Sequence, residues 1–454
     1  MKKKAISFLL NGTSLFPLLT LFLIIIPLAV FINPGIVPRY LGNSPITTEF
    51  GYLDLEHYIS IANNGYQTKW LTAFYPLWPF CIRLANSFFQ ADIYRIAILL
   101  STFLGLMSIY FSKNVFSRIA LQQSYASIST WIYTLSPMTI FFFVGYSEAL
   151  FSLESWILIG FMIDILHTNN KEKSSIKIKY FQIFVTCILI GLTRSTIAQT
   201  IFSCVGSFLI ILIIDKQINI NVVNKYLLLS IVIMLGTCFG YIIYGFLCLS
   251  EGHSFLEPFL AQKGWGKEFG IRPIYFFTSR SPLIDYWALY YPFLLIFNNL
   301  AEYSIFHNRF ELLKKCFSKN LPLTLVYPPI GILYALFSQK NNRRINFLPS
   351  QKNIKSHQNE IINSQQLDYL FWYTSFFALS HSLIVFFTQP YYLNGLARYV
   401  FGQPYFYVAL SLFISKSQRN ILYNPKIFYG ITVLISSIFL IKHFIDFGNA
   451  KLLT

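Results

Sequence analysis

Long apolar runs dominate the chain and are separated by short polar segments. Runs of about 18 apolar residues can cross a hydrocarbon layer roughly 30 Å thick as helices. The first run, Leu15 to Ile32, ends in Asn33-Pro34-Gly35 and predicts a retained membrane helix, because a cleaved signal peptide would need a shorter stretch and a small-residue cleavage site. Further runs lie at about 93–111, 126–144, 147–166, 180–193, 196–214, 226–248, 284–300, 320–337, 368–388, 398–415 and 427–445. The pattern predicts an all-α polytopic membrane protein with roughly eleven or twelve transmembrane helices.

Composition supports one integral membrane domain over residues 1–454. Hydrophobic residues make up 55% of the chain and charged residues only 12%, which excludes an ordinary soluble domain. The net charge of +17 does not indicate nucleic-acid binding, because most basic residues lie in short loops between apolar runs. Lys2, Lys3 and Lys4 predict a cytoplasmic N-terminus. When the spans are counted, the same side receives Lys113, Arg118, Lys171, Lys173, Lys177, Lys179, Lys216 and Lys225.

The second half of the chain does not fit one simple count of spans. Basic segments lie on both sides of the run 320–337, although a full span would put them on opposite faces. Pro328-Pro329 lies inside this run, so we expect a broken or re-entrant helix there. The segment 338–366, rich in Asn, Gln, Ser and Lys, is expected to be a mobile polar loop.

Several common kinds of functional site have no signature in this sequence. The six cysteines form no CxxC pair, so neither a metal cluster nor a disulfide framework is expected. The chain also contains no GxGxxG, no P-loop and no HExxH motif. We therefore expect no metal, no nucleotide site and no other cofactor.

Polar residues are densest between 33 and 90, the first loop on the side opposite the N-terminus. Residues 54–62 predict a short amphipathic helix at the membrane interface, ended by Asn63-Asn64-Gly65. Asp54, His57 and Tyr58 lie on one face of this helix by their spacing. The alternative interpretation is purely structural, with Asp54 as a charge at a helix N-terminus and His57 as an ordinary polar contact.

Other polar interruptions fall on the same predicted side of the membrane. A rigid aromatic and proline-rich turn at 73–79 precedes Arg83. Later interruptions are Tyr146-Ser147-Glu148, Arg194, the tract 255–266 with Gln262 and Trp265, and Arg398-Tyr399. Arginine near the membrane is costly enough to indicate an anionic partner, although snorkelling or a structural ion pair would also explain each one.

In order along the chain, these motifs resemble the PIG-V-type mannosyltransferases, which add the second mannose to glycosylphosphatidylinositol precursors and have prokaryotic relatives. The resemblance covers about residues 50–405 and rests on Asp54-x-x-His57-Tyr58, Ala73-Phe74-Tyr75-Pro76-Leu77-x-Pro79, Pro137, Tyr146-Ser147-Glu148, Arg194, Gln262-x-x-Trp265-Gly266 and Arg398-Tyr399. It implies a polytopic fold similar to the glycosyltransferase C class, a donor with mannose on a polyprenyl or dolichyl phosphate, and a glycolipid acceptor.

The resemblance also implies roles for individual residues. Asp54 is the expected general base and His57 a second catalytic residue, while Arg194 and Arg398 are expected near the departing phosphate, with His57 or Arg83 as substitutes. Glu56 is an alternative base, but two residues away on a helix it points away from Asp54. The expected substrate-binding residues are Tyr58, Arg83, Glu148, Arg194, Gln262, Trp265, Arg398 and Tyr399.

Two other classes of function remain open at this point. A transporter or flippase could use the intramembrane Glu154 and Asp164 as an ion path, although no inverted repeat is evident. A non-catalytic membrane scaffold is the third interpretation. The membrane is expected to be a prokaryotic plasma membrane, or the endoplasmic reticulum in a eukaryote. An enzyme should gather its outer polar groups at one place near the membrane surface, whereas a transporter should arrange them along a pore.

Overall fold

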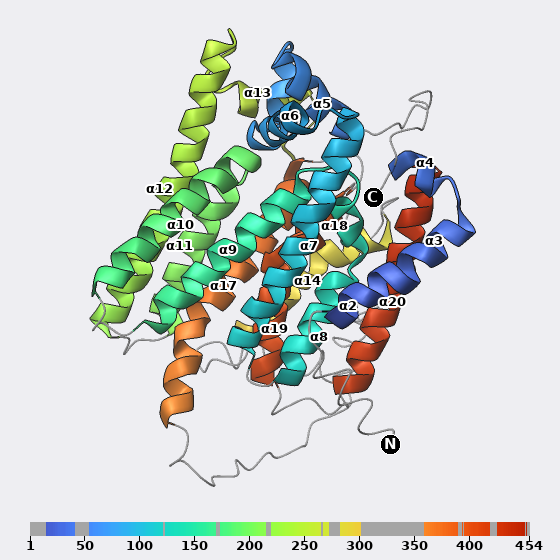
Figure 1. Ribbon diagram of the computed structural model, residues 1–454. Coiled ribbons are helices and arrows are strands. Elements are labelled where there is room, and N and C mark those ends of the chain that lie inside the picture. The colour runs from blue at the N-terminus through green and yellow to red at the C-terminus, as the bar shows by residue number, and fades with distance from the viewer. Residues whose placement is uncertain are drawn as a thin grey trace.

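The computed structural model describes residues 15–40, 54–120, 123–168, 173–214, 219–264, 267–271, 282–300, 358–388, 393, 395–417, 425–449 and 451. Within these residues all regular secondary structure is helical (Figure 1). The elements before the bundle's first long helix are α2 (Leu15–Thr20), the π-helical η1 (Leu21–Ile25), α3 (Ile26–Ile32), α4 (Ile36–Tyr40), α5 (Asp54–Asn64), the 3-10 turn η2 (Lys69–Ala73) and α6 (Leu77–Phe89). The later elements are α7 (Ile93–Ile119), α8 (Gln123–Thr134), the 3-10 turn η3 (Pro137–Phe142), α9 (Glu148–His167), α10 (Lys173–Thr193), α11 (Ile197–Ile214), α12 (Ile220–Ser250), α13 (Glu257–Gly264), α14 (Leu283–Leu300), α17 (Gln358–Thr388), α18 (Leu396–Phe401), α19 (Pro404–Ser417) and α20 (Pro425–Gly448).

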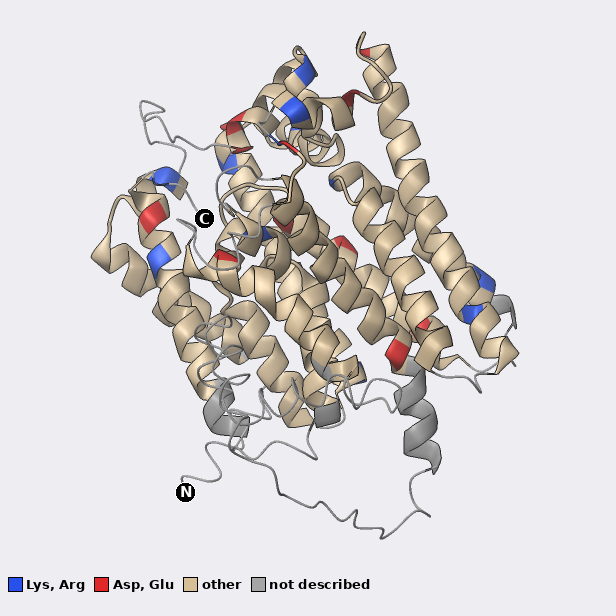
Figure 2. Cartoon of the chain, turned by 180° about the vertical axis from the view of Figure 1, so that it is seen from behind, with Lys and Arg blue, Asp and Glu red and all other residues tan. Residues whose placement is uncertain are grey.

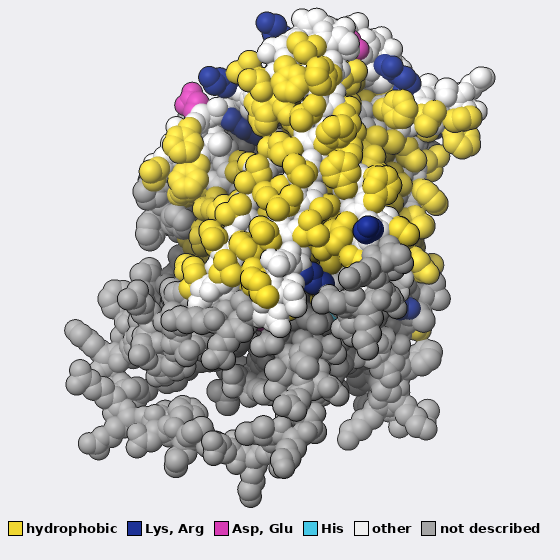
Figure 3. Space-filling model, turned by 90° about the vertical axis from the view of Figure 1, so that its left-hand side faces the viewer, with side chains coloured by type: hydrophobic (Ala, Val, Ile, Leu, Met, Phe, Trp, Pro, Cys, Tyr) yellow, Lys and Arg dark blue, Asp and Glu magenta, His cyan; other side chains and the backbone are white. Residues whose placement is uncertain are grey.

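Seven helices of the described chain are long and apolar enough to cross a membrane. These lie in α7, α9, α10, α11, α12, α17 and α20. The outer faces of α10 and α12 carry many exposed Ile, Leu, Val and Phe side chains, and Figure 3 shows the broad apolar surface that results. The prediction of an all-α polytopic membrane protein is therefore confirmed.

Two predicted spans are interrupted. The run 126–144 divides into α8 and η3, because Pro137 has no backbone N–H to donate and the chain turns at Ser136. The run 398–415 divides into α18 and α19 at Gly402, where a Cβ atom would lie only 2.4 Å from the carbonyl oxygen of Arg398. Each run was predicted as one continuous span, and this continuity was wrong.

The segment 33–90 contains more helix than the sequence predicted. The expected amphipathic helix is present as α5, and Gly65 follows it with φ +75° and donates its N–H to the carbonyl of Ile61 at 2.9 Å. Residues 77–89, however, form the amphipathic α6, which was not predicted and which includes the last three residues of the expected turn at 73–79. The boundary of the polar loop 338–366 was also wrong, because α17 already begins at Gln358.

Other sequence predictions lie outside the described residues. These are the broken helix at 320–337, the basic segments beside it, the first part of the polar loop and the N-terminal lysines.

The bundle has two chemically different ends. Helices α5, α6 and α13 lie together at one end (Figure 1), and Figure 2 shows few charged residues along the middle of the long helices. Helix α9 runs from Glu148, near α5, to His167, about 30 Å away for its 20 residues. At the His167 end, Arg118 pairs with Asp164, and Lys225 donates from Nζ to the carbonyl oxygen of Thr168 at 3.1 Å. Basic residues therefore lie at this end of the bundle, and others, among them Lys69, Arg83 and Lys263, lie at the end that carries α5.

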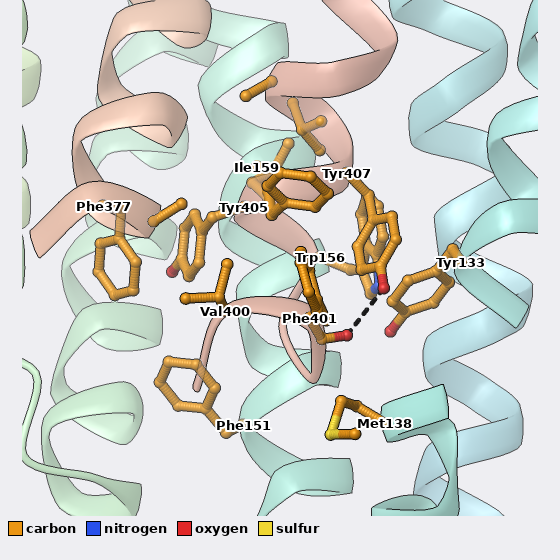
Figure 4. Close-up of a cluster of buried hydrophobic side chains, with 14 of the residues drawn as sticks. Tyr133, Met138, Phe151, Trp156, Ile159, Phe377, Val400, Phe401, Tyr405 and Tyr407 are labelled. Atoms are coloured by element: carbon orange, nitrogen blue, oxygen red, sulfur yellow. Dashed lines mark hydrogen bonds between the residues drawn. The ribbon is translucent and has the colours of Figure 1, made fainter. Parts of the chain in front are cut away.

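An aromatic cluster joins α9, α17, α18 and α19 in the bundle interior (Figure 4). The rings of Phe377 and Tyr405 stack with centroids 3.8 Å apart. Tyr407 donates its hydroxyl to the carbonyl oxygen of Phe401 at 2.9 Å and to Ser136 Oγ at 2.6 Å. These contacts hold the short α18 against the long helices, and α18 carries Arg398.

Helices α10 and α12 approach each other through glycines. A Cβ atom at Gly240 would lie 2.5 Å from the carbonyl oxygen of Ile188, and one at Gly236 would lie 2.7 Å from that of Phe184. Gly191 on α10 faces Thr237 in the same way, at 2.7 Å from its carbonyl oxygen. Small residues four positions apart allow such close helix contact in membranes, where packing replaces the hydrophobic effect between helices.

We predict that Gly240→Ala destabilises the protein, because the added methyl group forces α10 and α12 apart. Overpacking of this kind costs about 1–3 kcal/mol, and it should appear as a lower melting temperature of the purified protein in detergent. The matched control is Gly430→Ala in α20, where a Cβ atom meets nothing within 4 Å. Equal melting temperatures for the two variants would contradict the close contact.

Candidate functional site

The loop between η3 and α9 is docked against α5 and α6. Gly145 has φ +80°, and a Cβ atom there would lie 3.0 Å from the methyl groups of Leu55, so glycine is required both by conformation and by space. Trp78 donates its indole N–H to the carbonyl oxygen of Gly145 at 3.0 Å. The hydroxyls of Tyr58 and Ser147 are hydrogen-bonded at 2.9 Å. These contacts bring the first residue of α5 next to the first residue of α9.

Four charged residues from four parts of the chain form a continuous ion network at this place. Arg398 donates from Nη1 to Asp54 Oδ2 at 2.6 Å and from Nε to Glu148 Oε1. Arg194 donates from Nη1 to the same Glu148 oxygen at 2.9 Å. Glu148 is therefore shared by both arginines, and Arg398 bridges two carboxylates that the sequence separates widely.

The members of this network differ in exposure. The side chain of Glu148 is 0% exposed, those of Arg194 and Arg398 are 13% and 14% exposed, and that of Asp54 is 28% exposed. Asp54 is thus the carboxylate that a molecule outside the protein can reach, while Glu148 holds the arginines from within. The network contains two acidic and two basic groups and is close to neutral overall.

Aromatic rings support both guanidinium groups. Such cation–π contacts keep a guanidinium favourable where water is scarce. The distances from the guanidinium carbon to the ring centroid are 4.8 Å to Phe141 and 4.7 Å to Tyr146 for Arg398, and 5.1 Å to Tyr399 and 5.7 Å to Phe151 for Arg194. Tyr399 in turn lies nearly parallel to the ring of His381, with centroids 5.9 Å apart. The arginines are held in place by both charge and packing.

His57 lies next to the network but in a different environment. The centroid of its ring lies 4.8 Å from the ring centroid of Trp70 and 5.0 Å from that of Phe74. Burial lowers the pKa of His57, although Asp54 and Glu56 act to raise it. The imidazole is therefore neutral at neutral pH, which favours a hydrogen-bonding role over the fixed cation that was considered for it.

Two other predicted site residues lie outside the network. Arg83 donates to the carbonyl oxygens of Ala62 and Ile61, at the opposite end of α5 from Asp54, and so satisfies the end of that helix. Gln262, which lies on α13, accepts a hydrogen bond of 2.8 Å from Nζ of Lys267. Trp265 lies outside the described residues.

The sequence analysis missed Asp285, a 0% exposed carboxylate in the first turn of α14. It accepts a hydrogen bond from the backbone N–H of Ala397, next to Arg398. A signal existed, because Asp285 is a lone acidic residue near the start of an apolar run, as Glu148 is.

The two acidic residues considered for an ion path lie apart on α9. Glu154 accepts a hydrogen bond from Thr193 at 3.0 Å in the interior. Asp164 pairs with Arg118 at the far end of the helix, about 15 Å away for ten residues. Each has its own partner, and among the described residues they form no common site.

We predict that Glu148→Gln strongly destabilises the protein, because both buried arginines lose their shared counter-charge. Removing one partner of a buried ion pair costs about 3–5 kcal/mol, which should lower the melting temperature by several degrees. Asp446→Asn is the matched control, since it breaks the pair with Lys442, whose side chain is 62% exposed, and should cost at most about 1 kcal/mol. A Glu148→Gln variant as stable as this control would mean that the network contributes little.

The lowered pKa of His57 predicts that the folded protein loses stability in acid. Because the folded protein holds this pKa below that of the unfolded chain, about 6.5, the unfolded chain takes up the proton first. Stability should be unaffected above pH 6.5 and should fall as the pH drops below that value. In melting curves between pH 7.5 and 5, His57→Gln should show a smaller decrease than the unchanged protein. An identical decrease would mean that His57 is not the group responsible.

Comparison with known protein families, with curated proteins and with solved structures finds no match for this chain.

Proposed function

We propose that this protein is a membrane glycosyltransferase that moves a sugar from a polyprenyl or dolichyl phosphate to a hydroxyl group of a glycolipid. The resemblance of its motifs to the PIG-V-type mannosyltransferases makes mannose the expected sugar. The acceptor would then be a glycosylphosphatidylinositol precursor or a similar glycolipid. No metal or nucleotide would take part in the transfer.

The observation that carries this proposal is the network of Asp54, Glu148, Arg194 and Arg398. It combines one partly exposed carboxylate with two arginines at one end of a bundle of apolar helices. A base beside cationic groups is the combination that sugar transfer from a lipid phosphate requires, since a proton must be removed and an anion must depart. The lipid chain of the donor would lie among the apolar helices.

In the proposed reaction Asp54 takes the proton from the acceptor hydroxyl. The acceptor oxygen then attacks the anomeric carbon of the sugar from the side opposite the phosphate, and the bond between that carbon and the phosphate oxygen breaks. The products are the glycosylated acceptor and the lipid phosphate, and the proton stays on Asp54 until it passes to water. The configuration at the anomeric carbon is inverted.

Protonation of Asp54 would also assist departure of the phosphate, through the charge on Arg398. In the resting protein Asp54 neutralises part of the charge on Arg398. When Asp54 accepts the proton, it loses its negative charge, and Arg398 is left with more positive charge for the departing phosphate. Arg194 would assist through Glu148, which keeps both guanidinium groups in place.

The orientation predicted from the sequence, which puts the basic loop residues at 113–118, 171–179 and 216–225 in the cytoplasm, supports a site on the non-cytoplasmic face. Arg118, Lys179 and Lys225 lie around the end of α9 that is opposite Glu148. Basic residues collect on the cytoplasmic side of membrane proteins. With that end in the cytoplasm, the network faces the other compartment, where lipid-linked sugars would serve as donors.

Convergence of the polar groups favours an enzyme over a transporter. Predicted site residues from α5, α9, the end of α10 and α18 meet at one end of the bundle, whereas Glu154 and Asp164 lie separately along α9. An ion path would instead need polar groups in sequence through the membrane.

We predict that Asp54→Asn abolishes turnover while the protein remains folded. Asparagine keeps the size of the side chain but cannot accept the proton, and loss of a general base costs about 10²–10⁴ in rate. Arg398→Ala should lower the rate by about 10²–10³, because the departing phosphate loses a preorganised charge. The assay would use purified protein in lipid nanodiscs with polyprenyl-phosphate mannose and a glycolipid acceptor, and mass spectrometry would detect the product.

Glu56→Gln is the matched control, because it removes a carboxylate from the same helix two residues away from Asp54. It should retain most of the activity. Nucleotide-mannose should give no product in the same assay. Activity with Asp54→Asn but not with Glu56→Gln would exchange the two carboxylate roles, and product from nucleotide-mannose alone would overturn the proposed donor.

A further inference from the structure

Asp285 is an acidic residue that lies entirely inside the protein. Its side chain is 0% exposed in the first turn of α14, where the helix dipole favours negative charge. Its Oδ1 accepts a hydrogen bond of 2.7 Å from the backbone N–H of Ala397, 112 residues further along the chain. It forms no ion pair with any residue in the described part of the chain. Burying a carboxylate costs several kcal/mol, and the hydrogen bond from Ala397 offsets part of this cost.

The hydrogen bond caps the start of α18. A helix start leaves backbone N–H groups without partners, and a side-chain oxygen at the preceding residue usually satisfies one of them. Here the preceding residue is Gly395, at φ +71°, which has no side chain to do so. Asp285 supplies the missing oxygen from α14.

This cap acts directly beside Arg398. Helix α18 has only six residues and ends at Phe401, so little of its own structure holds it in place. Arg398 must nevertheless reach Asp54 on one side and Glu148 on the other. A misplacement of about 1 Å at a catalytic centre can cost roughly 10²-fold in rate, so the position of α18 determines whether Arg398 can make both contacts.

We propose that Asp285 is a positioning residue for Arg398: by capping α18 it holds the guanidinium where it bridges Asp54 and Glu148. Asp285 does not touch the substrate and acts only through Arg398. This inference rests on the proposed function for its effect on the reaction, but the structural part of it can be measured without any reaction.

The test compares four single variants, of which one is Arg398→Ala, and one double variant of the full-length protein in nanodiscs. Asp285→Ala removes the cap, while Asp285→Asn keeps an oxygen that can accept the same hydrogen bond. Ser382→Ala is the matched control, because it removes a buried hydrogen bond of 2.9 Å to Ala288 on the same α14 without touching α18. Hydrogen exchange of the peptide covering 395–401 and the turnover of polyprenyl-phosphate mannose are both measured.

In Asp285→Ala, exchange in the 395–401 peptide should accelerate and kcat should fall about 10- to 100-fold, with a smaller change in KM. Asp285→Asn should stay within about threefold of the unchanged protein, and Ser382→Ala should match it. Combining Asp285→Ala with Arg398→Ala should give the same rate as Arg398→Ala alone, because interactions that act through one residue are not additive.

Three results would overturn the inference. These are unchanged exchange in folded Asp285→Ala, equal losses of rate in Asp285→Asn and Asp285→Ala, or a further loss in the double variant. Should Asp285→Ala not fold, Asp285→Asn still decides, since it must keep slow exchange at 395–401. Faster exchange in Asp285→Ala from a protein without transferase activity would refute the proposed function and leave the cap established.

Discussion

The shared carboxylate of Glu148 is the interaction on which the site depends. It lies fully buried at the start of α9 and binds both Arg194 and Arg398. Two arginines cannot be kept near each other in an apolar bundle unless an opposite charge lies between them. Arg398 also reaches Asp54, and this contact joins the outer helix α5 to the bundle. Without Glu148, the four segments that carry these residues would have no common point of attachment.

Packing around the network explains why it is ordered. The loop before α9 is held by Trp78 and by the close contact of Gly145 with Leu55, while aromatic rings lie against both guanidinium groups. Asp285 restrains the other side by capping α18. Rigid surroundings of this kind are what a catalytic centre needs, because its charges must be in place before the reaction begins. Among the four side chains of the network, that of Asp54 is the most exposed.

Part of this site could be recognised in the sequence. Charged residues are so rare in and beside the apolar runs that Glu148, Arg194 and Arg398 are conspicuous. Helical spacing correctly assigned α5, which begins at Asp54, and its end at Gly65. Length and hydropathy likewise determined the membrane class, because both are properties of single segments.

Only the tertiary structure decided what each polar residue contacts. Arg83 satisfies the end of α5 and lies away from the network, His57 lies between aromatic rings, and Asp285 reaches α18 across 112 residues. Nor did the apolar runs reveal that Pro137 divides one predicted span. The physical reason is that helical periodicity defines the face on which a side chain lies but not the neighbour that it meets, and that neighbour depends on the packing of segments far apart in the chain.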